Sequence, residues 1–400
     1  MIALLSEAAH ARRGRCRGQS SQTPAARAST EPGRKEDEPM PIAAVFAAVM
    51  LQFAPEPDPG LSERAAALID ETGSPGGAVL VVEDDAARVG VAGVRIRGEE
   101  PAIEPGDLWH LGSNTKAMTA TLAARLVEQG AIDWDATVGD VLGEAVETIE
   151  PAYREATLAD LLAHRARLPA NLGAVNMVRL AGSDAGRDAA ADRRRYAAWV
   201  LAASPAAEEG EFLYSNAGYV VAGLMLETAA GEPYETLMRR EVFDPLGMAT
   251  AGWGPPGTRG EADQPRGHGS GLLGGLSPRE PGARADNPPA MNSAGRAHMS
   301  LGDLGRFLAA HLDGARGDER YLSEESWRRL HAPAGESGYA LGWSEGEDGG
   351  LEHAGSNTMW FVKMAVWPDA GRAAAVAIND GRIEEVADPV GRAVDEFAPD

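Results

Sequence analysis

Short runs of β-branched and small apolar residues lie near both ends of the sequence, and helical spacing of apolar residues dominates between them. In the N-terminal part, Asp84-Asp85 separates two such runs, which is typical of a hairpin. A turn at residues 369–371 separates two runs near the C-terminus. Strands from both ends most simply share one antiparallel sheet. The predicted strands are residues 77–83, 87–95, 339–344, 359–368 and 371–378.

The longest helical pattern covers residues 113–129, with apolar or small residues on most sides and Gly130 at its end. Such a helix is expected to be buried. The other predicted helices are residues 61–71, 157–163, 192–203, 217–230, 233–241, 301–312, 323–330 and 383–397. The pattern predicts an α+β fold, in which helices flank the antiparallel sheet and a mostly helical lobe lies beside it. Residues 254–289 form a long Gly- and Pro-rich connection, which is typical of a functional or mobile loop.

The first sixty residues differ from the rest. Residues 1–39 show no apolar periodicity, which predicts a disordered or over-extended N-terminus. Residues 41–54 are an apolar run, as long as a signal-peptide core and too short to span a bilayer. We interpret residues 40–60 as a signal peptide and linker, residues 61–400 as one domain, and the mature protein as periplasmic or extracellular. The alternative is a helix packed on the domain of a cytoplasmic protein.

Charge and cysteine content exclude several classes of protein. The chain has 400 residues, of which 37 are basic and 60 acidic, and a formal net charge of −23. Because so acidic a surface repels phosphate backbones, a nucleic-acid-binding protein is excluded. The single cysteine, Cys16, excludes a disulfide framework and a cysteine-based metal site.

Lysine is rare in this chain, which contains only Lys35, Lys116 and Lys363. Lys116 follows Ser113 by three positions at the start of the long helix, so both side chains lie on one helical face. The helix N-terminus favours developing negative charge and offers a backbone N–H to an oxyanion. A desolvated lysine can lose its proton and activate a serine, which arginine cannot do. The alternative is an N-cap serine beside an ordinary lysine.

A second motif, Tyr214-Ser215-Asn216, precedes the predicted helix 217–230. A phenol next to a lysine ammonium ionises more readily than a free tyrosine and can then move a proton. The amide of Asn216 can donate to a substrate carbonyl and steady Lys116. In the alternative interpretation Asn216 caps the helix and Tyr214 is a packing residue.

A third motif, His353-Ala354-Gly355-Ser356, leads into the predicted strand 359–368. A glycine at a strand edge lets a substrate backbone approach, and the N–H of Ser356 is a candidate second oxyanion donor. In a chain with 48 glycines this pattern carries no weight by itself. A Gly-x-Ser-x-Gly sequence, which an α/β-hydrolase needs, does not occur; residues 267–271 come nearest.

In this order the three motifs resemble the serine β-lactamase and penicillin-binding protein superfamily, in the class C-like branch that includes D-alanyl-D-alanine carboxypeptidases and esterases. The resemblance runs from about residue 61 to residue 397. It implies a β-lactamase/transpeptidase-like fold, with Ser113 as nucleophile and Lys116 as its base. Tyr214 would carry a proton to the leaving group and assist deacylation. Which of Lys116 and Tyr214 takes the first proton stays open.

The resemblance also implies the substrate-binding residues. Asn216 would orient Lys116 and the substrate amide. His353 would line the substrate end beside Gly355, and the N–H groups of Ser113 and Ser356 would form the oxyanion hole. No metal or organic cofactor is implied. The expected partner is a small-molecule or peptide substrate.

Two departures from the family pattern matter. His353-Ala354-Gly355 stands where β-lactamases usually have Lys-Thr-Gly, which argues against efficient β-lactamase activity because a typical histidine is mostly neutral at pH 7. Arg167 stands where relatives usually have glycine, so the loop shape there is in doubt. His164, in the same segment, is interpreted as structural rather than catalytic.

Two functional classes stay open at this point. We favour an exported serine hydrolase that cleaves an ester or amide through an acyl-enzyme. A catalytically inactive relative is expected to have lost at least one of four residues that this chain retains: Ser113, Lys116, Tyr214 and Asn216. The second class is a non-catalytic or slowly acylated sensor of penicillin or peptidoglycan. The sequence does not choose between esterase, D-amino-acid peptidase and weak β-lactamase, and it leaves the oligomeric state and the start codon open.

The export prediction has a direct test. If residues 41–54 are a signal, secreted protein begins after this segment, and N-terminal sequencing of the secreted material will find no trace of it. Secreted protein that retains residues 41–54 would contradict the prediction.

Overall fold

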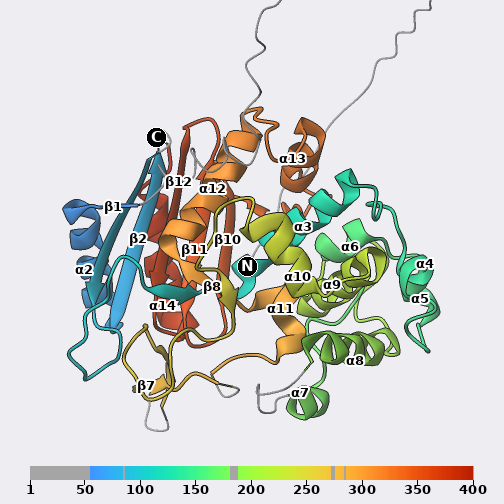
Figure 1. Ribbon diagram of the computed structural model, residues 1–400, viewed down its shortest axis with the longest axis horizontal. Coiled ribbons are helices and arrows are strands. Elements are labelled where there is room, and N and C mark those ends of the chain that lie inside the picture. Colours follow the sequence, from blue (N-terminus) through green and yellow to red (C-terminus); the bar gives the residue numbers. More distant parts are fainter. Residues whose placement is uncertain (1–54, 84–85, 181–187, 272–274, 283–284, 400) are drawn as a thin grey trace, which may run out of the picture. The chain divides into compact units, whose positions relative to one another are not determined.

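Strands from both ends of the chain form one seven-stranded sheet in the computed structural model (Figure 1). The order is β1-β3-β2-β12-β11-β10-β9, and neighbouring strands are antiparallel except β1 and β3, which are parallel. The strands are β1 (Glu56–Pro57), β2 (Gly76–Glu83), β3 (Ala86–Gly93), β9 (Ser344–Glu345), β10 (Leu351–Ser356), β11 (Phe361–Trp367) and β12 (Arg372–Ile378). The predicted fold class is confirmed.

The structure describes residues 55–83, 86–180, 188–271, 275–282 and 285–399. The predicted disordered segment 1–39 and the predicted signal 41–54 therefore lie outside the described residues. In the described part of segment 40–60, which was interpreted as signal peptide and linker, β1 pairs with β3 and a helix begins at Pro59. None of the described helices is long and apolar enough to cross a bilayer.

Both faces of the sheet are buried, which explains why its central strands are apolar throughout. In β2, Val79 and Val81 join the core beneath helices α2 (Pro59–Thr72) and α14 (Ile383–Asp395). Leu80 and Val82 point to the opposite face, which α12 (Leu301–Ala315) crosses (Figure 1). This alternation has the period of two that a strand imposes on its side chains.

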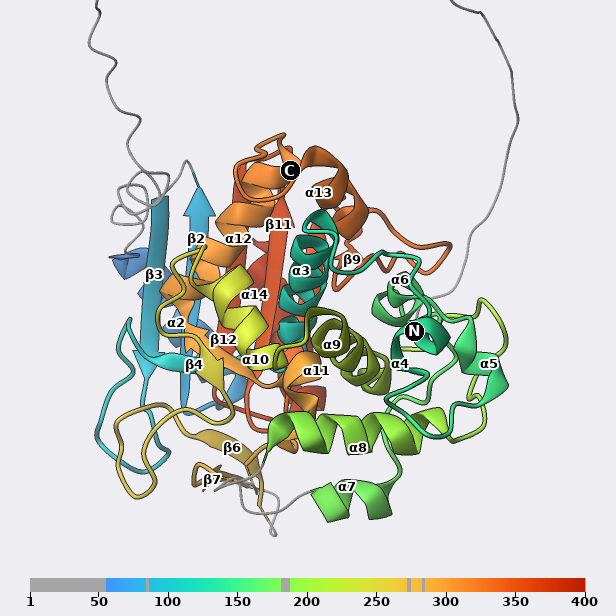
Figure 2. The same ribbon diagram turned by 45° about the vertical axis from the view of Figure 1, so that its right-hand side comes forward.

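Helix α9 (Asn216–Ala230) is the centre of the helical part of the fold, and α3, α4, α6 and α8 contact it (Figure 2). Its residues from Ala217 to Glu227 are all buried. The remaining helices are η1 (Gly112–Asn114), α3 (Thr115–Glu128), α4 (Val138–Leu142), α5 (Pro151–Arg154), α6 (Leu158–Leu162), α7 (Ala174–Leu180), α8 (Ala189–Leu201), α10 (Tyr234–Met238), η2 (Arg239–Phe243), η3 (Pro289–Met291), α11 (Asn292–Gly295) and α13 (Glu324–His331).

Two small sheets complete the fold. One has the order β4-β8-β5, and the other is the hairpin of β6 and β7. Their strands are β4 (Leu108–His110), β5 (Gly252–Trp253), β6 (Gly267–Ser270), β7 (Leu276–Arg279) and β8 (Ala297–Ser300). The hairpin lies within the predicted long connection 254–289 and is attached to the domain, since His268 N–H donates to the carbonyl of Met359 at 2.9 Å.

Several predicted elements need correction. Residues 339–344 were predicted as a strand, but a single bridge joins Tyr339 to Ser344 around a turn in which Gly342 has a positive φ. Conversely, the third motif was placed at the edge of a strand, and it lies inside β10. The predicted helix 233–241 divides into α10 and the π-helical turn η2. In each case local composition did not show where the backbone hydrogen bonds are made.

The buried histidine of β6 predicts acid sensitivity. His268 is fully buried, its Nδ1 lies 2.8 Å from the carbonyl of Asn379, and its Nε2 accepts the N–H of Arg97. Burial lowers its pKa to about 4, whereas the pKa of an unfolded histidine is about 6.5. The unfolded chain therefore binds more protons between these values, and the free energy of unfolding falls as the pH decreases through this window, by about 1.4 kcal/mol per pH unit for one such group.

We expect His268→Gln to show a shallower pH dependence over this window. Urea unfolding at pH 7, 6 and 5 measures the slope for both proteins. Identical slopes would contradict the prediction.

Candidate active site

Ser113 and Lys116 meet where η1 joins α3. The amine Nζ of Lys116 lies 3.0 Å from Oγ of Ser113, as the i, i+3 spacing predicts. Nζ also lies 2.7 Å from Oδ1 of Asn216 and 2.7 Å from the carbonyl oxygen of Ala294. Three segments distant in sequence (η1–α3, α9 and α11) thus converge on one nitrogen.

Burial controls the charge of Lys116. The side chain is fully buried, and this burial lowers its pKa well below the usual value. Among the described residues, no carboxylate forms an ion pair with it to oppose that shift. A neutral amine has two N–H groups and one lone pair. Because the oxygens of Asn216 and Ala294 only accept, they take the two N–H groups and leave the lone pair for the hydroxyl of Ser113.

Tyr214 differs from its predicted state. The sequence suggested that a neighbouring ammonium would help the phenol to ionise. Burial instead raises the pKa of Tyr214 to about 12, and the hydroxyl of Ser113 only partly offsets this effect. Nζ of Lys116 lies over the ring, 4.9 Å from its centroid, where it faces the π-electrons. The phenol is therefore neutral near pH 7.

Asn216 faces Lys116 because its neighbour caps the helix. Oγ of Ser215 accepts the N–H of Gly218 at 2.9 Å and donates to the carbonyl of Pro169. The amide of Asn216 is thereby left for Lys116 on one side and for Asn171 on the other, where Nδ2 donates to Oδ1 at 2.9 Å. The alternative in which Asn216 is a simple N-cap is excluded.

His353 lies in β10 and is only 6% exposed. Its Nε2 is 3.1 Å from the hydroxyl of Tyr339. Burial, together with nearby Lys116, lowers its pKa to about 3. The imidazole, which was expected to line the substrate end, is thus a buried and neutral group.

Gly355 and Ser356 bring β10 against η1 with direct backbone contact. A Cβ placed on Gly355 would lie 2.7 Å from the amide nitrogen of Ser113. A Cβ placed on Gly112 would lie 2.3 Å from the amide nitrogen of Ser356. Only glycine fits at these two positions, and Gly112 also has a φ of 51°. The amides of Ser113 and Ser356 are therefore close neighbours.

A family model described as Beta-lactamase matches residues 61–397. The chain belongs to the beta-lactamase family. This is a family of serine hydrolases.

Three relatives illustrate the similarity. The chain is 29% identical over 337 residues to penicillin-binding protein 4 of Amycolatopsis lactamdurans, which covers 80% of this chain and 84% of that protein. It is 29% identical over 181 residues to unguisins hydrolase ungD of Aspergillus violaceofuscus, but these residues are 44% of this chain and only 31% of that longer protein. The D-stereospecific amidohydrolase of Streptomyces sp. superposes with a TM-score of 0.62 at 22% identity, covering 86% of this chain and 98% of that one.

The segment in which this beta-lactamase-family protein departs from the usual pattern is well anchored. Arg167 has a φ of 63°, the left-handed conformation that glycine favours, and its Nε donates to the carbonyl of Ala207 at 3.1 Å. His164, with a φ of 60°, accepts the N–H of Ser215 on Nδ1 at 3.0 Å. Its ring lies 4.3 Å from that of Tyr214. His164 thus supports the second motif, and the doubt about loop shape at Arg167 is resolved.

Three contributors to the site were missed by sequence reasoning. The carbonyl of Ala294 accepts a hydrogen bond from Lys116, and Oδ1 of Asn171 accepts one from Asn216. The hydroxyl of Tyr339 is hydrogen-bonded to His353. A backbone carbonyl has no side-chain signature, so Ala294 could not be found. Asn171 lies outside the three motifs and outside every predicted helix and strand. Tyr339 was assigned to a strand.

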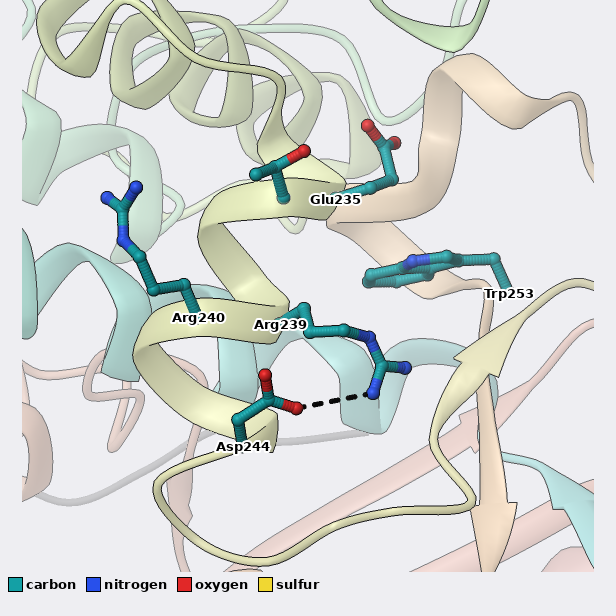
Figure 3. A pocket seen from close by; sticks show the side chains of 6 residues that line it. Glu235, Arg239, Arg240, Asp244 and Trp253 are labelled. Carbon is teal, nitrogen blue, oxygen red and sulfur yellow. Dashed lines mark hydrogen bonds and ion pairs between the residues drawn. The ribbon is translucent and has the colours of Figure 1, made fainter. Parts of the chain in front are cut away.

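A pocket of about 500 Å³ lies elsewhere, between α10, η2 and β5 (Figure 3). Its arginines are already engaged, since Arg239 donates to the carbonyl of Ala251 and Arg240 pairs with Glu232 and Glu241. It contains none of the predicted site residues. Among the described residues, no group of three His, Cys, Asp or Glu side chains is arranged to hold a metal ion.

The buried amine of Lys116 predicts the effect of replacing it with a group that is permanently charged. In Lys116→Arg the permanently charged guanidinium cannot act as a base, so turnover of a nitrophenyl ester is expected to fall by about 10²–10⁴-fold. The matched control is Lys363→Arg on β11, where Nζ pairs with Glu352 and Asp395 and a guanidinium suits the same partners. We expect the control to keep its turnover. Thermal melting verifies folding, and a folded, active Lys116→Arg would contradict the assignment.

Proposed function

We propose that this protein hydrolyses an ester or amide bond of a small molecule or short peptide through an acyl-enzyme on Ser113. The observation that supports this most is the buried amine of Lys116, which has no counter-carboxylate among the described residues and lies 3.0 Å from the hydroxyl of Ser113. A lysine in this state is a base rather than a fixed charge.

In the proposed acylation step, Oγ of Ser113 attacks the carbonyl carbon while its proton passes to Nζ of Lys116. The substrate oxygen becomes an oxyanion that accepts hydrogen bonds from the N–H groups of Ser113 and Ser356. The tetrahedral intermediate then collapses and the bond to the leaving group breaks. The neutral phenol of Tyr214 gives its proton to the leaving group and takes the proton that Lys116 holds, which restores the base. Because the pKa of this phenol is about 12, Lys116 takes the first proton.

Deacylation repeats these transfers with water. The water gives its proton to the base and attacks the acyl carbon, and Ser113 leaves with a proton. Asn216, which shares its amide between Lys116 and Asn171, keeps the amine in place during both steps.

The substrate preference follows from His353. Because its pKa is about 3, the imidazole carries no charge at pH 7 and offers no cation to a substrate carboxylate. We therefore expect esters and amides without a carboxylate at this end to react better than penicillin. The names of the unguisins hydrolase and the D-stereospecific amidohydrolase agree with a hydrolytic reaction, and the second name agrees with an amide substrate.

A second candidate is a slowly acylated penicillin-binding protein. The similarity to penicillin-binding protein 4, which extends over 84% of that protein, favours it. It differs from the first proposal in deacylation, because a sensor stays acylated and a hydrolase does not.

Intact mass spectrometry combined with a turnover assay separates these proposals. The protein, Ser113→Ala and the control Ser270→Ala are each exposed to penicillin and to a short-chain nitrophenyl ester. We expect Ser113-dependent turnover of the ester and little of penicillin, with Ser270→Ala active because Ser270 is an exposed serine in β6. A lasting Ser113 adduct without turnover would favour the sensor. Neither adduct nor turnover with both probes would count against both.

A further inference from the structure

A buried carboxylate, Asp286, lies outside all three motifs. Its side chain is fully enclosed, and Oδ2 lies 2.9 Å from Nε2 of His110 and 2.9 Å from Nε of Arg296. Oδ1 accepts from Nδ2 of Asn357 at 3.1 Å. Burial by itself raises the pKa of Asp286, but His110 and Arg296 outweigh it and lower the pKa below its usual value, so the group is ionised. One charged group thus joins β4, the residue between α11 and β8, and the segment after β10.

The first connection leads to the nucleophile. Nδ1 of His110 accepts the backbone N–H of Gly112 at 3.2 Å, and Gly112 directly precedes Ser113. A nitrogen that accepts carries no proton, so the ring proton of His110 is on Nε2 and points to Asp286. The ring is also stacked on Trp360, with 5.4 Å between centroids. Asp286 thereby fixes both the tautomer and the orientation of His110.

The second connection leads to the other amide. Asn357 directly follows Ser356 and donates from Nδ2 to Asp286 and to the carbonyl of Ala285, both at 3.1 Å. Its Oδ1 accepts the N–H groups of Met359 and Trp360. The chain that leaves β10 is therefore tied to the same carboxylate as the chain that enters η1.

These two connections meet at the backbone contact between Gly112 and Ser356. Oxyanion donors act only within about 2.7–3.1 Å of the developing charge, and loss of one donor costs about 10²–10³-fold in rate. A small displacement of either segment would therefore slow the chemical step, which lowers kcat, and would leave substrate binding little changed.

We propose that Asp286 is a positioning residue which, through His110 and Asn357, holds the amides of Ser113 and Ser356 at the spacing that an oxyanion requires. This inference rests on the proposed acyl-enzyme function. It adds residues that contact neither substrate nor the reacting atoms and act through the backbone.

Two substitutions of His110 separate the two hydrogen bonds of its ring, because each variant keeps one bond and loses the other. An asparagine amide overlays the Nδ1 half and can still accept the N–H of Gly112, whereas a glutamine amide overlays the Nε2 half and can still donate to Asp286. The control is His298→Gln. His298 lies opposite His110 in the register of β4 and β8 and bonds through Nδ1 to the carbonyl of Gly254.

The experiment measures kcat and KM for a short-chain nitrophenyl ester, inhibition by phenylboronic acid, which forms a tetrahedral adduct on an active serine, and the melting temperature. We expect His110→Gln to lower kcat by about 10²-fold and to weaken boronate inhibition in parallel, with KM little changed. His110→Asn loses the link to Asp286 and is therefore expected to lower kcat as well, whereas His298→Gln should retain kcat even if its melting temperature falls.

Asp286→Asn and Asn357→Ala provide independent variants if a His110 variant does not fold, and each is expected to lower kcat with KM little changed. A purely structural network would lower the melting temperature of these variants and leave kcat and boronate inhibition as in the wild type, which would overturn the inference while the proposed function stands. A folded His110→Asn with the wild-type kcat would also overturn it, because Asp286 would then not act through His110. A wild-type protein without turnover would overturn the proposed function, and this inference with it.

Discussion

The burial of one amine is the constraint on which the arrangement of this molecule depends. Desolvation lowers the pKa of Lys116, and three oxygens from η1, α9 and α11 surround its nitrogen. A buried polar group needs hydrogen-bond partners, so these three segments must stay together. The elements around the site supply that stability: α9 is buried along most of its length, and Ser215 and His164 fix the loop before it.

Close backbone packing is the second requirement of the site. Gly112 and Gly355 let η1 and β10 approach without intervening side chains, which brings two amides together at the edge of the sheet. Asp286, His110 and Asn357 lie behind this contact and link its two sides through hydrogen bonds. Catalysis by an oxyanion hole depends on such preorganisation, because donors that are already oriented need no rearrangement when charge develops.

Neutral groups surround the amine of Lys116. His353 and His164 both have lowered pKa values because they are buried, and Tyr214 has a raised one. Around neutral pH these groups keep the site without fixed charge, so Lys116 meets little local repulsion or attraction beyond its hydrogen-bonding partners. This environment suits a lysine that gives and takes a proton.

The sequence by itself determined the strands of the main sheet other than β1, β9 and β10, most of the long helices and the meeting of Ser113 with Lys116, because these depend on residue spacing over a few positions. Only the tertiary structure decided the neutral state of Tyr214, the burial of His353, the turn at residues 339–344 and the contacts of Ala294 and Asp286. Desolvation and contacts between distant segments have no signature in local spacing. A charge neighbour can be inferred from a motif, whereas the low dielectric that outweighs it exists only once the chain has folded.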